Sequence, residues 1–448
     1  MPEKSQIAST KRPGRGSAND GSLSLSWSGK ADAVAAADTK SAHSLRKVAA
    51  LCAGDEQSGN VILEGDNLDG LKLLLPKYEN RVRLIYIDPP YNTGNAFVFH
   101  DSYEHAGWLN MMYPRLALAR RMLADNGVIF VSIDDNEADK LKLVMSELFS
   151  ETNFLAQITV QSNPRGRQAE RHFASVHEYL LVFARNAQHC NLLGAELTEE
   201  QSQEFDLTDD GGRRYRLLGL RQRGSHSLRE DRPAMYYPIY VDPDTGSISL
   251  TATKRHRAEV LPRKSTGQAG RWMWGHKRAK DNIDLLEARL IRGRNEWDIF
   301  VRDYFDDENG NSRRRKLKTI WDDKSLNYQN GKRELKQLLG KALVDYPKPT
   351  ALLRKLIDLV EEKDALFMDF FAGSGTLGDA VLQANAEDGG ARRFILMQQP
   401  ESTEDADFPT IADVCRERVR RVVANISPSP TAVATAASLL GFTYYRTI

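Results

Sequence analysis

Two apolar runs in this 448-residue chain end in short turn sequences, and these two places constrain the fold more than any other feature. The run from Val82 to Ile87 continues into Asp88-Pro89-Pro90-Tyr91. The run from Ala365 to Phe370 continues into Phe371-Ala372-Gly373-Ser374-Gly375-Thr376. Each run indicates a buried parallel strand, and the carboxyl ends of such strands are where open α/β sheets bind their ligands.

Helical periodicity separates these and the other predicted strands. We expect further strands at 61–63, 128–133, 154–160, 179–183 and 393–397. Apolar residues recur at helical spacing at about 68–75, 112–123, 136–148, 351–360, 377–384 and 410–425. This alternation predicts an α/β fold with a doubly wound, mostly parallel sheet and right-handed crossovers.

The alternation stops between residues 186 and 330, where loop-forming pairs, basic clusters and scattered aromatic residues replace it. Such a stretch is too long for a plain connection in a compact domain, so we expect an inserted subdomain at 186–330. Residues 1–57 are rich in Ser, Ala, Gly and Lys and are expected to form a flexible tail. Residues 58–185 and 331–427 would then be two halves of one domain, with 428–448 as an extension.

The formal net charge of +1 conceals a strongly basic middle region. Between residues 211 and 280, sixteen lysines and arginines face only five acidic residues. A basic region inside a neutral chain favours a surface that binds a polyanion. The alternative is an arginine-rich surface that water alone solvates.

Composition narrows the class of protein further. Hydrophobic residues at 41% and charged residues at 27% are typical of a soluble globular protein. No apolar stretch is long enough to cross a bilayer, and the start has no secretory signal pattern. The three cysteines, Cys52, Cys190 and Cys415, show neither CxxC pairing nor metal-ligand spacing, so we expect a reduced, cytoplasmic setting and no metal.

The first turn sequence has groups suited to an exocyclic amine of a nucleobase. Such an amine is a poor nucleophile because its lone pair is delocalised into the ring. Asp88 can accept one of its N–H groups and the carbonyl of Pro89 the other, which would localise the lone pair. Pro89 and Pro90 fix the backbone and donate no N–H. Tyr91 offers a face on which a base can stack, worth roughly 1–3 kcal/mol. An ordinary turn after a strand is the alternative.

The second turn sequence suits a ligand that contains a nucleoside, because glycine lets the backbone approach a ligand closely. Gly373, Gly375 and Gly378 also match the GxGxxG spacing of dinucleotide sites, so a nicotinamide or flavin enzyme is an alternative. That fingerprint requires an acidic residue about 20 positions later, where Gln398 stands instead. Asp369 could bond polar groups of the ligand or could cap the turn. The chain contains no GxxxxGK[ST] phosphate loop.

Together and in this order, the two turn sequences resemble the beta group of N6-adenine and N4-cytosine DNA methyltransferases, which use S-adenosyl-L-methionine. More narrowly, the chain is similar to the modification subunits of type III restriction–modification systems. Supporting stretches are 63–68, 177–180, 320–323, 346–349, 393–401 and 409–413. The resemblance covers roughly residues 58–425 and implies that the basic insertion recognises the target DNA.

The resemblance also implies roles for individual residues. Phe371, Ala372, Gly373, Ser374 and Gly375 would surround the methionine and ribose parts of the cofactor. Lys348 would meet the cofactor carboxylate, and Asp66 would lie near its adenine. Asp369 and Gln398 complete the expected cofactor set. The family usually has an acidic residue where Gln398 stands, and Glu401 follows slightly later, so the ribose contact is left open.

The expected activity is methyl transfer to adenine N6 in double-stranded DNA, by base flipping and direct displacement. Asp88 favours adenine, because relatives that methylate cytosine N4 more often have serine there. A C5-cytosine enzyme is disfavoured because the chain has no Pro-Cys sequence. The alternatives are N4-cytosine transfer, transfer to RNA, or a catalytically inert DNA-recognition subunit. Residues 58–185 would be the catalytic half and 331–427 the cofactor-binding half.

The resemblance has consequences for partners and location as well. Modification subunits of this kind dimerise and can recruit a helicase–nuclease restriction subunit. The sequence therefore predicts double-stranded DNA as a partner and allows a homodimer and a restriction subunit. It predicts no membrane partner and a cytoplasmic protein that is nucleoid-associated when bound to DNA.

Overall fold

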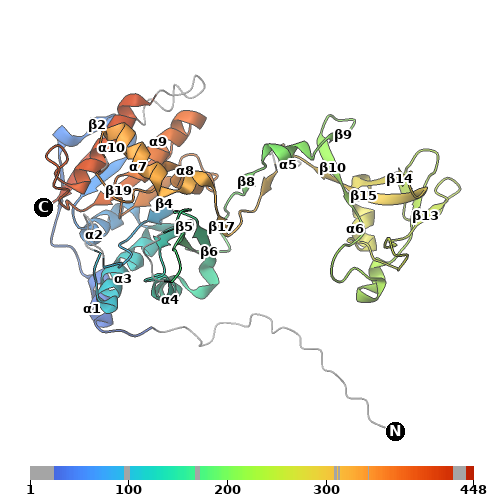
Figure 1. The fold of residues 1–448 in the computed structure, drawn as a ribbon, viewed down its shortest axis with the longest axis horizontal. Coiled ribbons are helices and arrows are strands. Elements are labelled where there is room, and N and C mark those ends of the chain that lie inside the picture. Colours follow the sequence, from blue (N-terminus) through green and yellow to red (C-terminus); the bar gives the residue numbers. More distant parts are fainter. Residues whose placement is uncertain are drawn as a thin grey trace, which may run out of the picture. The chain divides into compact units, whose positions relative to one another are not determined.

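The computed structural model describes residues 25–94, 101–166, 172–306, 310, 313–341, 343–426 and 440–448. It divides into two compact units, one formed by residues up to 193 together with 317–448, and the other by 194–316 (Figure 1). Each unit has its own apolar core. The described residues include no helix with the length and hydropathy of a membrane span.

The first unit is built on a large mixed sheet. Its strands are β1 (Leu45–Lys47), β2 (Ala53–Gly54), β3 (Val61–Glu64), β4 (Val82–Ile87), β5 (Leu123–Ile133), β6 (Phe154–Val160), β7 (Glu178–Ala184), β17 (Ile320–Trp321), β18 (Leu366–Asp369), β19 (Arg393–Gln398) and β20 (Gly441–Thr447). The strand order is β1-β20-β3-β19-β18-β4-β5-β7-β6-β17, and β2 pairs with β20. From β20 to β5 all neighbours are parallel, whereas β7 is antiparallel to both β5 and β6. The predicted doubly wound, mostly parallel α/β fold is confirmed.

Helices cover both faces of this sheet (Figure 1). They are α1 (Lys30–Asp38), α2 (Asn67–Tyr78), α3 (His105–Met122), α4 (Ala138–Phe149), α7 (Tyr328–Leu339), α8 (Thr350–Ile357), α9 (Thr376–Asp388) and α10 (Ile411–Asn425). Successive residues of β4 point to opposite faces, so Ile85 packs with α2, α3 and α4 while Leu84 packs with α8, α9 and α10. Burial on both faces explains why the strands are continuously apolar.

The predicted flexible tail at 1–57 is wrong for its described part, residues 25–57. Helix α1 packs on α3, where the indole N–H of Trp27 donates to Asn110 Oδ1 over 2.7 Å. The Lys30 ammonium forms an ion pair with Glu147, and β1 pairs with β20. The alanines of this helix lie on all of its sides, so its sequence has no periodic apolar signal. Its order comes from these contacts with distant parts of the chain, which composition does not reveal.

The predicted C-terminal extension also belongs to the sheet over its described part. Strand β20 lies between β1 and β3 and is parallel to β3, with Tyr444 opposite Ile62. Phe442 and Tyr444 are buried in the core of the first unit. Residues 440–448 therefore extend the sheet rather than leaving it.

The second unit has two small antiparallel sheets around a separate core and a third sheet in which β8 pairs with β16. Its strands are β8 (Ala195–Glu196), β9 (Leu207–Thr208), β10 (Arg214–Gly219), β11 (Ile239–Val241), β12 (Ile248–Ser249), β13 (Ala258–Val260), β14 (Leu286–Ile291), β15 (Glu296–Tyr304) and β16 (Arg314–Arg315). Its helices are α5 (Glu199–Gln203) and α6 (His276–Asp281). The sheets have the orders β14-β15-β10-β9 and β12-β11-β13. Trp272, Ile239 and Ile299 lie fully buried between them.

The second unit is shorter than the predicted insertion at 186–330. Residues 317–330 belong to the first unit, because β17 pairs in parallel with β6 and Trp321 is buried in that core. The two-residue strand is too short to give a sequence pattern. Its place in the sheet comes from pairing with a strand about 160 residues earlier in the chain.

Candidate functional site

The two turn sequences line one cavity of about 260 Å³ at the carboxyl ends of β4 and β18. These two strands are hydrogen-bonded neighbours, so their ends meet although 280 residues separate them in the chain. The predicted site residues in the lining are Asp88, Pro89, Pro90, Tyr91, Lys348, Asp369, Phe371, Ala372, Gly373, Ser374 and Gln398. Asp66 and Gly375 are absent from this lining.

Asp88 shares the cavity with a buried cation. The Lys348 ammonium lies 3.1 Å from Asp88 Oδ1 and 2.9 Å from Glu178 Oε2, and it donates to the Tyr91 hydroxyl over 2.7 Å. The Tyr91 hydroxyl in turn donates to Glu178 Oε2 over 3.0 Å. The site therefore contains two carboxylates, one ammonium and one phenol in mutual contact. The sequence prediction did not include Glu178.

Burial and charge act on this group in opposite directions. Burial raises the pKa of Asp88, the Lys348 ammonium opposes that shift, and the Glu178 carboxylate adds to it. Burial alone would lower the pKa of Lys348, but Asp88 and Glu178 outweigh it and raise the pKa. Burial, Asp88 and Glu178 raise the pKa of Tyr91 well above its ordinary value. Tyr91 is therefore a neutral phenol and Lys348 a cation at neutral pH.

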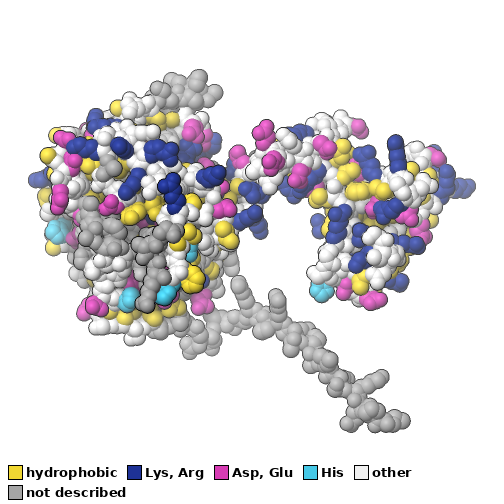
Figure 2. Space-filling model, in the orientation of Figure 1, with side chains coloured by type: hydrophobic (Ala, Val, Ile, Leu, Met, Phe, Trp, Pro, Cys, Tyr) yellow, Lys and Arg dark blue, Asp and Glu magenta, His cyan; other side chains and the backbone are white. Residues whose placement is uncertain are grey.

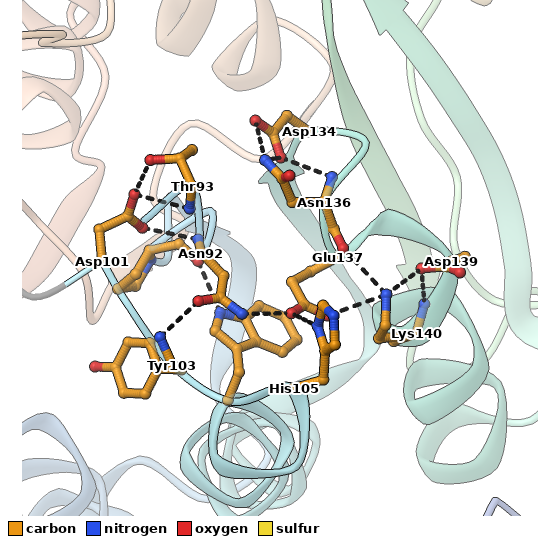
Figure 3. Close-up of polar contacts among 12 residues, drawn as sticks. Asn92, Thr93, Asp101, Tyr103, His105, Asp134, Asn136, Glu137, Asp139 and Lys140 are labelled. Atoms are coloured by element: carbon orange, nitrogen blue, oxygen red, sulfur yellow. Dashed lines mark hydrogen bonds and ion pairs between the residues drawn. The ribbon is translucent and has the colours of Figure 1, made fainter. Parts of the chain in front are cut away.

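The backbone after Asp88 is fixed by the helix beneath it. The indole N–H of fully buried Trp108, in α3, donates to the carbonyl of Pro90 over 2.8 Å. Asp101 accepts from the backbone N–H groups of Asn92 and Thr93, at 2.8 and 3.0 Å (Figure 3). Residues 90–93 are thus hydrogen-bonded to Asp101 and Trp108.

A second polar group supports the same segment from α4. Glu137 is fully buried and accepts from the side-chain amide of Asn92 over 2.6 Å (Figure 3). Its other neighbours are His105, at 2.5 Å, and Lys140, at 3.5 Å. The side-chain oxygen of Asn92 accepts from the Tyr103 backbone N–H over 2.7 Å. These contacts join Asn92 to residues 103–105 and to Glu137.

The glycine turn is shaped by its own backbone. Gly373 has φ +52° and Gly375 has φ +79°, a region that residues with a Cβ rarely adopt. The Gly375 N–H donates to the Ala372 carbonyl over 2.8 Å. Asp369 Oδ1 accepts from the Phe371 N–H over 2.9 Å, so Asp369 caps the turn. Burial raises the pKa of Asp369 well above its ordinary value.

Gln398 connects the turn with Glu401. Its side-chain oxygen accepts from the Gly373 N–H over 2.7 Å, and its side-chain nitrogen donates to Glu401 Oε2 over 3.0 Å. Glu401 lines the cavity, and burial raises its pKa to about 7. The amide at 398 therefore holds both the turn and a nearby carboxyl group.

Arg418 supports the turn from behind, and the sequence prediction did not include it. This fully buried arginine of α10 donates to Ser374 Oγ at 3.1 Å, Thr376 Oγ1 at 2.9 Å and Asp379 Oδ2 at 2.9 Å. Arg418 lies four residues after Val414 and four before Val422, on the apolar face of the helix. An arginine at a position predicted to be buried indicates a buried polar contact, and this pattern could have identified Arg418 from the sequence.

Asp66 and Gly375 have structural contacts outside the cavity. Asp66 caps α2 by accepting from the Leu68 N–H over 2.8 Å, and its other oxygen contacts Arg115 at 3.0 Å. Gly375 precedes α9, and a Cβ there would lie 3.0 Å from the carbonyl oxygen and the sulfur of Cys415. A glycine is required at 375 because the turn lies directly against α10. Direct cofactor contacts for both residues stay predictions.

The cavity can bind a flat aromatic group beside a carboxylate and a second group against a glycine turn. Among the described residues no cluster of histidine, cysteine and acidic side chains has the arrangement of a metal site. The chemistry available comes from Asp88, Glu178, Lys348 and Tyr91. These groups can orient a hydrogen-bonding substrate and accept a proton.

Comparison with known proteins agrees with this geometry. A family model described as DNA methylase matches residues 82–403. The Mod subunit of the type III restriction–modification enzyme EcoPI, from Escherichia phage P1, is 31% identical and aligns with 88% of this chain and 66% of its own length. The type II methyltransferase M.KpnI of Klebsiella pneumoniae is 33% identical, over 83% of this chain and 89% of its own.

Two further matches complete the comparison. The StyLTI Mod subunit of Salmonella typhimurium is 33% identical and aligns with 88% of this chain and 61% of its own length. The chain thus spans less than two thirds of the length of these Mod subunits. Among solved structures, the PvuII cytosine-N4-specific DNA methyltransferase has 12% identity and a TM-score of 0.39, over 85% of this chain and 93% of its own.

Proposed function

Because this chain belongs to the DNA methylase family, we propose that it transfers a methyl group from S-adenosyl-L-methionine to adenine N6 in double-stranded DNA. The observation that supports this proposal most directly is the shared cavity. Asp88, which suits an exocyclic amine, and Gly373, which suits a nucleoside-containing cofactor, line the same cavity at neighbouring strand ends.

The cofactor half of the cavity fits this molecule. A Cβ built on Gly373 would meet only the Phe371 carbonyl oxygen, at 4.0 Å, so a ligand can approach the turn backbone closely. Phe371, Ala372, Gly373 and Ser374 would surround the cofactor, and Glu401 would accept from its ribose hydroxyls. When bound, the cofactor would supply an electrophilic methyl group on a cationic sulfur.

The other half would hold the base. An adenine must leave the duplex before its amine can reach Asp88, and Tyr91 offers the face on which it stacks. Asp88 and the Pro89 carbonyl accept the two amine N–H groups and direct the nitrogen lone pair at the methyl group. As the new N–C bond forms and the methyl–sulfur bond breaks, leaving the sulfur as a neutral thioether, the amine would give up one proton, which Asp88 is placed to accept.

We further propose that the second unit, residues 194–316, recognises the target DNA. Many lysine and arginine side chains lie on its surface (Figure 2). Arg213, Arg229 and Arg278 stack on the rings of Tyr304, Tyr236 and Trp274 at 3.8, 4.5 and 4.7 Å. A guanidinium held over an aromatic ring keeps its N–H groups in its own plane, from where they can reach phosphates or base edges.

The Mod relatives also motivate a proposal about assembly. These relatives are named as Mod subunits of type III restriction–modification enzymes. We propose that this chain acts as a modification subunit that dimerises and binds a helicase–nuclease restriction subunit. Light scattering of the purified protein, alone and mixed with the restriction subunit of a type III enzyme, tests both parts.

The test of the proposed activity is a product analysis. The protein is incubated with methyl-labelled S-adenosyl-L-methionine and either duplex DNA or RNA. The nucleic acid is then digested to nucleosides, which are identified by mass spectrometry. We expect labelled N6-methyldeoxyadenosine from DNA. N4-methyldeoxycytidine would support the cytosine alternative on the same fold. DNA and cofactor binding without any labelled nucleoside would support an inert recognition subunit.

A further inference from the structure

The strongest unexplained feature of the cavity is a second buried carboxylate. Glu178 is 6% exposed and lies, with Asp88, against the single ammonium of Lys348. Burying two carboxylates against one ammonium lowers the stability of the fold, because one of the two negative charges is not neutralised. Such an arrangement indicates a functional role. The proposed methyl transfer requires Asp88 and leaves Glu178 unexplained.

The sheet topology explains how Glu178 reaches the site. It is the first residue of β7, and β7 runs antiparallel to β5. An antiparallel strand brings its amino end to the edge where the parallel strands end. Glu178 therefore enters the cavity from a strand that begins there, whereas Asp88 enters from one that ends there.

The distances show which carboxylate holds the ammonium more closely. Lys348 Nζ lies 2.7 Å from the Tyr91 hydroxyl, 2.9 Å from Glu178 and 3.1 Å from Asp88. Tyr91 also donates to Glu178, so Lys348, Tyr91 and Glu178 form a closed set of contacts. Asp88 contacts the same ammonium at 3.1 Å, so the two carboxylates share it.

We propose that Glu178 is a positioning residue that holds Lys348 away from full pairing with Asp88, so that Asp88 stays an available acceptor for the substrate amine. The inference depends on the proposed methyl transfer. Without Glu178 the ammonium and its three N–H groups would turn to Asp88. The amine would then have to displace a charge-assisted hydrogen bond, which is stronger than the one that it can offer.

The same arrangement sets the protonation of Asp88. The groups around it are Lys348, which favours its ionised form, and Glu178, which disfavours that form. Tyr86, Tyr91, Asp134, Asp369 and His177 also line the cavity. Removing the Glu178 charge should lower the pKa of Asp88, and removing the Lys348 charge should raise it. Any charge this close to Asp88 would shift its pKa, so the titration tests the contact and the kinetics test the positioning role.

The experiment measures Asp88 directly in the protein without cofactor. The protein is labelled with ¹³C at aspartate carboxyls, the Asp88 signal is assigned with Asp88→Asn, and the signal is titrated. We expect Glu178→Gln to lower the pKa of Asp88 by about one unit and Lys348→Met to raise it by a similar amount. Glu178→Asp keeps a charge farther away, so its decrease should be smaller. Glu79→Gln removes an exposed carboxylate paired with Arg121 and should change nothing.

Kinetics provide the second readout. In Glu178→Gln we expect kcat to fall about 10- to 100-fold. The acid limb of the pH profile should move to lower pH, and Glu178→Asp should recover much of the loss. Should Glu178→Gln fail to fold, Glu178→Asp provides the same test. An unchanged pKa of Asp88 in the folded variants overturns the inference. A wild-type protein that methylates no nucleic acid refutes the proposed function instead, whatever the titration shows.

Discussion

The two strand ends that meet in the cavity are built in different ways. At the end of β4 the functional groups are side chains: Asp88, Tyr91 and their charged partners contact one another within the cavity. At the end of β18 the surface is backbone, and the side chains that shape it, such as Arg418, contact it from outside. A substitution at the first end should therefore remove chemistry, and one at the second end should remove shape.

The largest effect is expected at Asp88. Replacing Asp88 by Ala removes the acceptor of the amine, so we expect kcat to fall by at least about 10³-fold. Cofactor affinity should stay within a few-fold, because the glycine turn is untouched. Single-turnover methylation and calorimetric titration with the cofactor measure the two quantities. Near-normal turnover in Asp88→Ala would contradict the role given to this residue.

Arg418 should show the opposite pattern, a loss of stability. Arg418→Met leaves the buried Asp379 carboxylate without its cationic partner and removes the guanidinium N–H groups from the hydroxyls of Ser374 and Thr376. We expect unfolding free energy to fall by about 3–5 kcal/mol. The matched control is Arg420→Met on the same helix, where the side chain is 49% exposed and pairs with Glu417. That variant should change stability by no more than about 0.5 kcal/mol. Equal losses in chemical denaturation would refute the assignment.

The sequence predicts those parts of the fold and the site that depend on patterns within short stretches of the chain. Strands β4, β5, β18 and β19 are evident because most of their residues, such as Val128 to Val131, are apolar, as burial on both faces requires. The meeting of Asp88 with Gly373 also follows, since parallel neighbours end at one edge. Both depend only on patterns within short stretches.

The rest depended on contacts between distant stretches. Glu178 could not be placed, because an apolar run does not reveal in which direction its strand runs. Helix α3 begins at His105, seven residues before the expected start, and its early turns are fixed by buried Trp108 against the Pro90 carbonyl. Strand β20 required pairing with β3, which lies almost 400 residues earlier in the chain.

Substitutions at Gly375 and Gly373 distinguish the packing of the turn from its proposed contact with the cofactor. In Gly375→Ala the Cβ would meet Cys415 at 3.0 Å with φ at +79°, so we expect a loss of about 2–3 kcal/mol of stability. Gly373→Ala, with φ +52° and its Cβ in open space, should cost only about 1 kcal/mol but should weaken cofactor binding. Thermal unfolding and cofactor titration of both variants give the comparison. A larger loss of stability in Gly373→Ala would refute the packing argument for Gly375.

The smallest effect is expected at Glu401, a carboxyl group that lines the cavity and contacts Gln398 beside the glycine turn. Its pKa is about 7 because burial disfavours its charge, and hydrogen bonds from ribose hydroxyls would favour that charge. Binding should therefore release a proton, and wild-type affinity should rise as the pH increases from 6 to 8. Glu401→Gln should bind about 10-fold more weakly at pH 8 and lose most of this dependence, because an amide does not ionise. Calorimetric titration at each pH measures this, and a wild-type affinity that is flat across the range would remove Glu401 from the cofactor site.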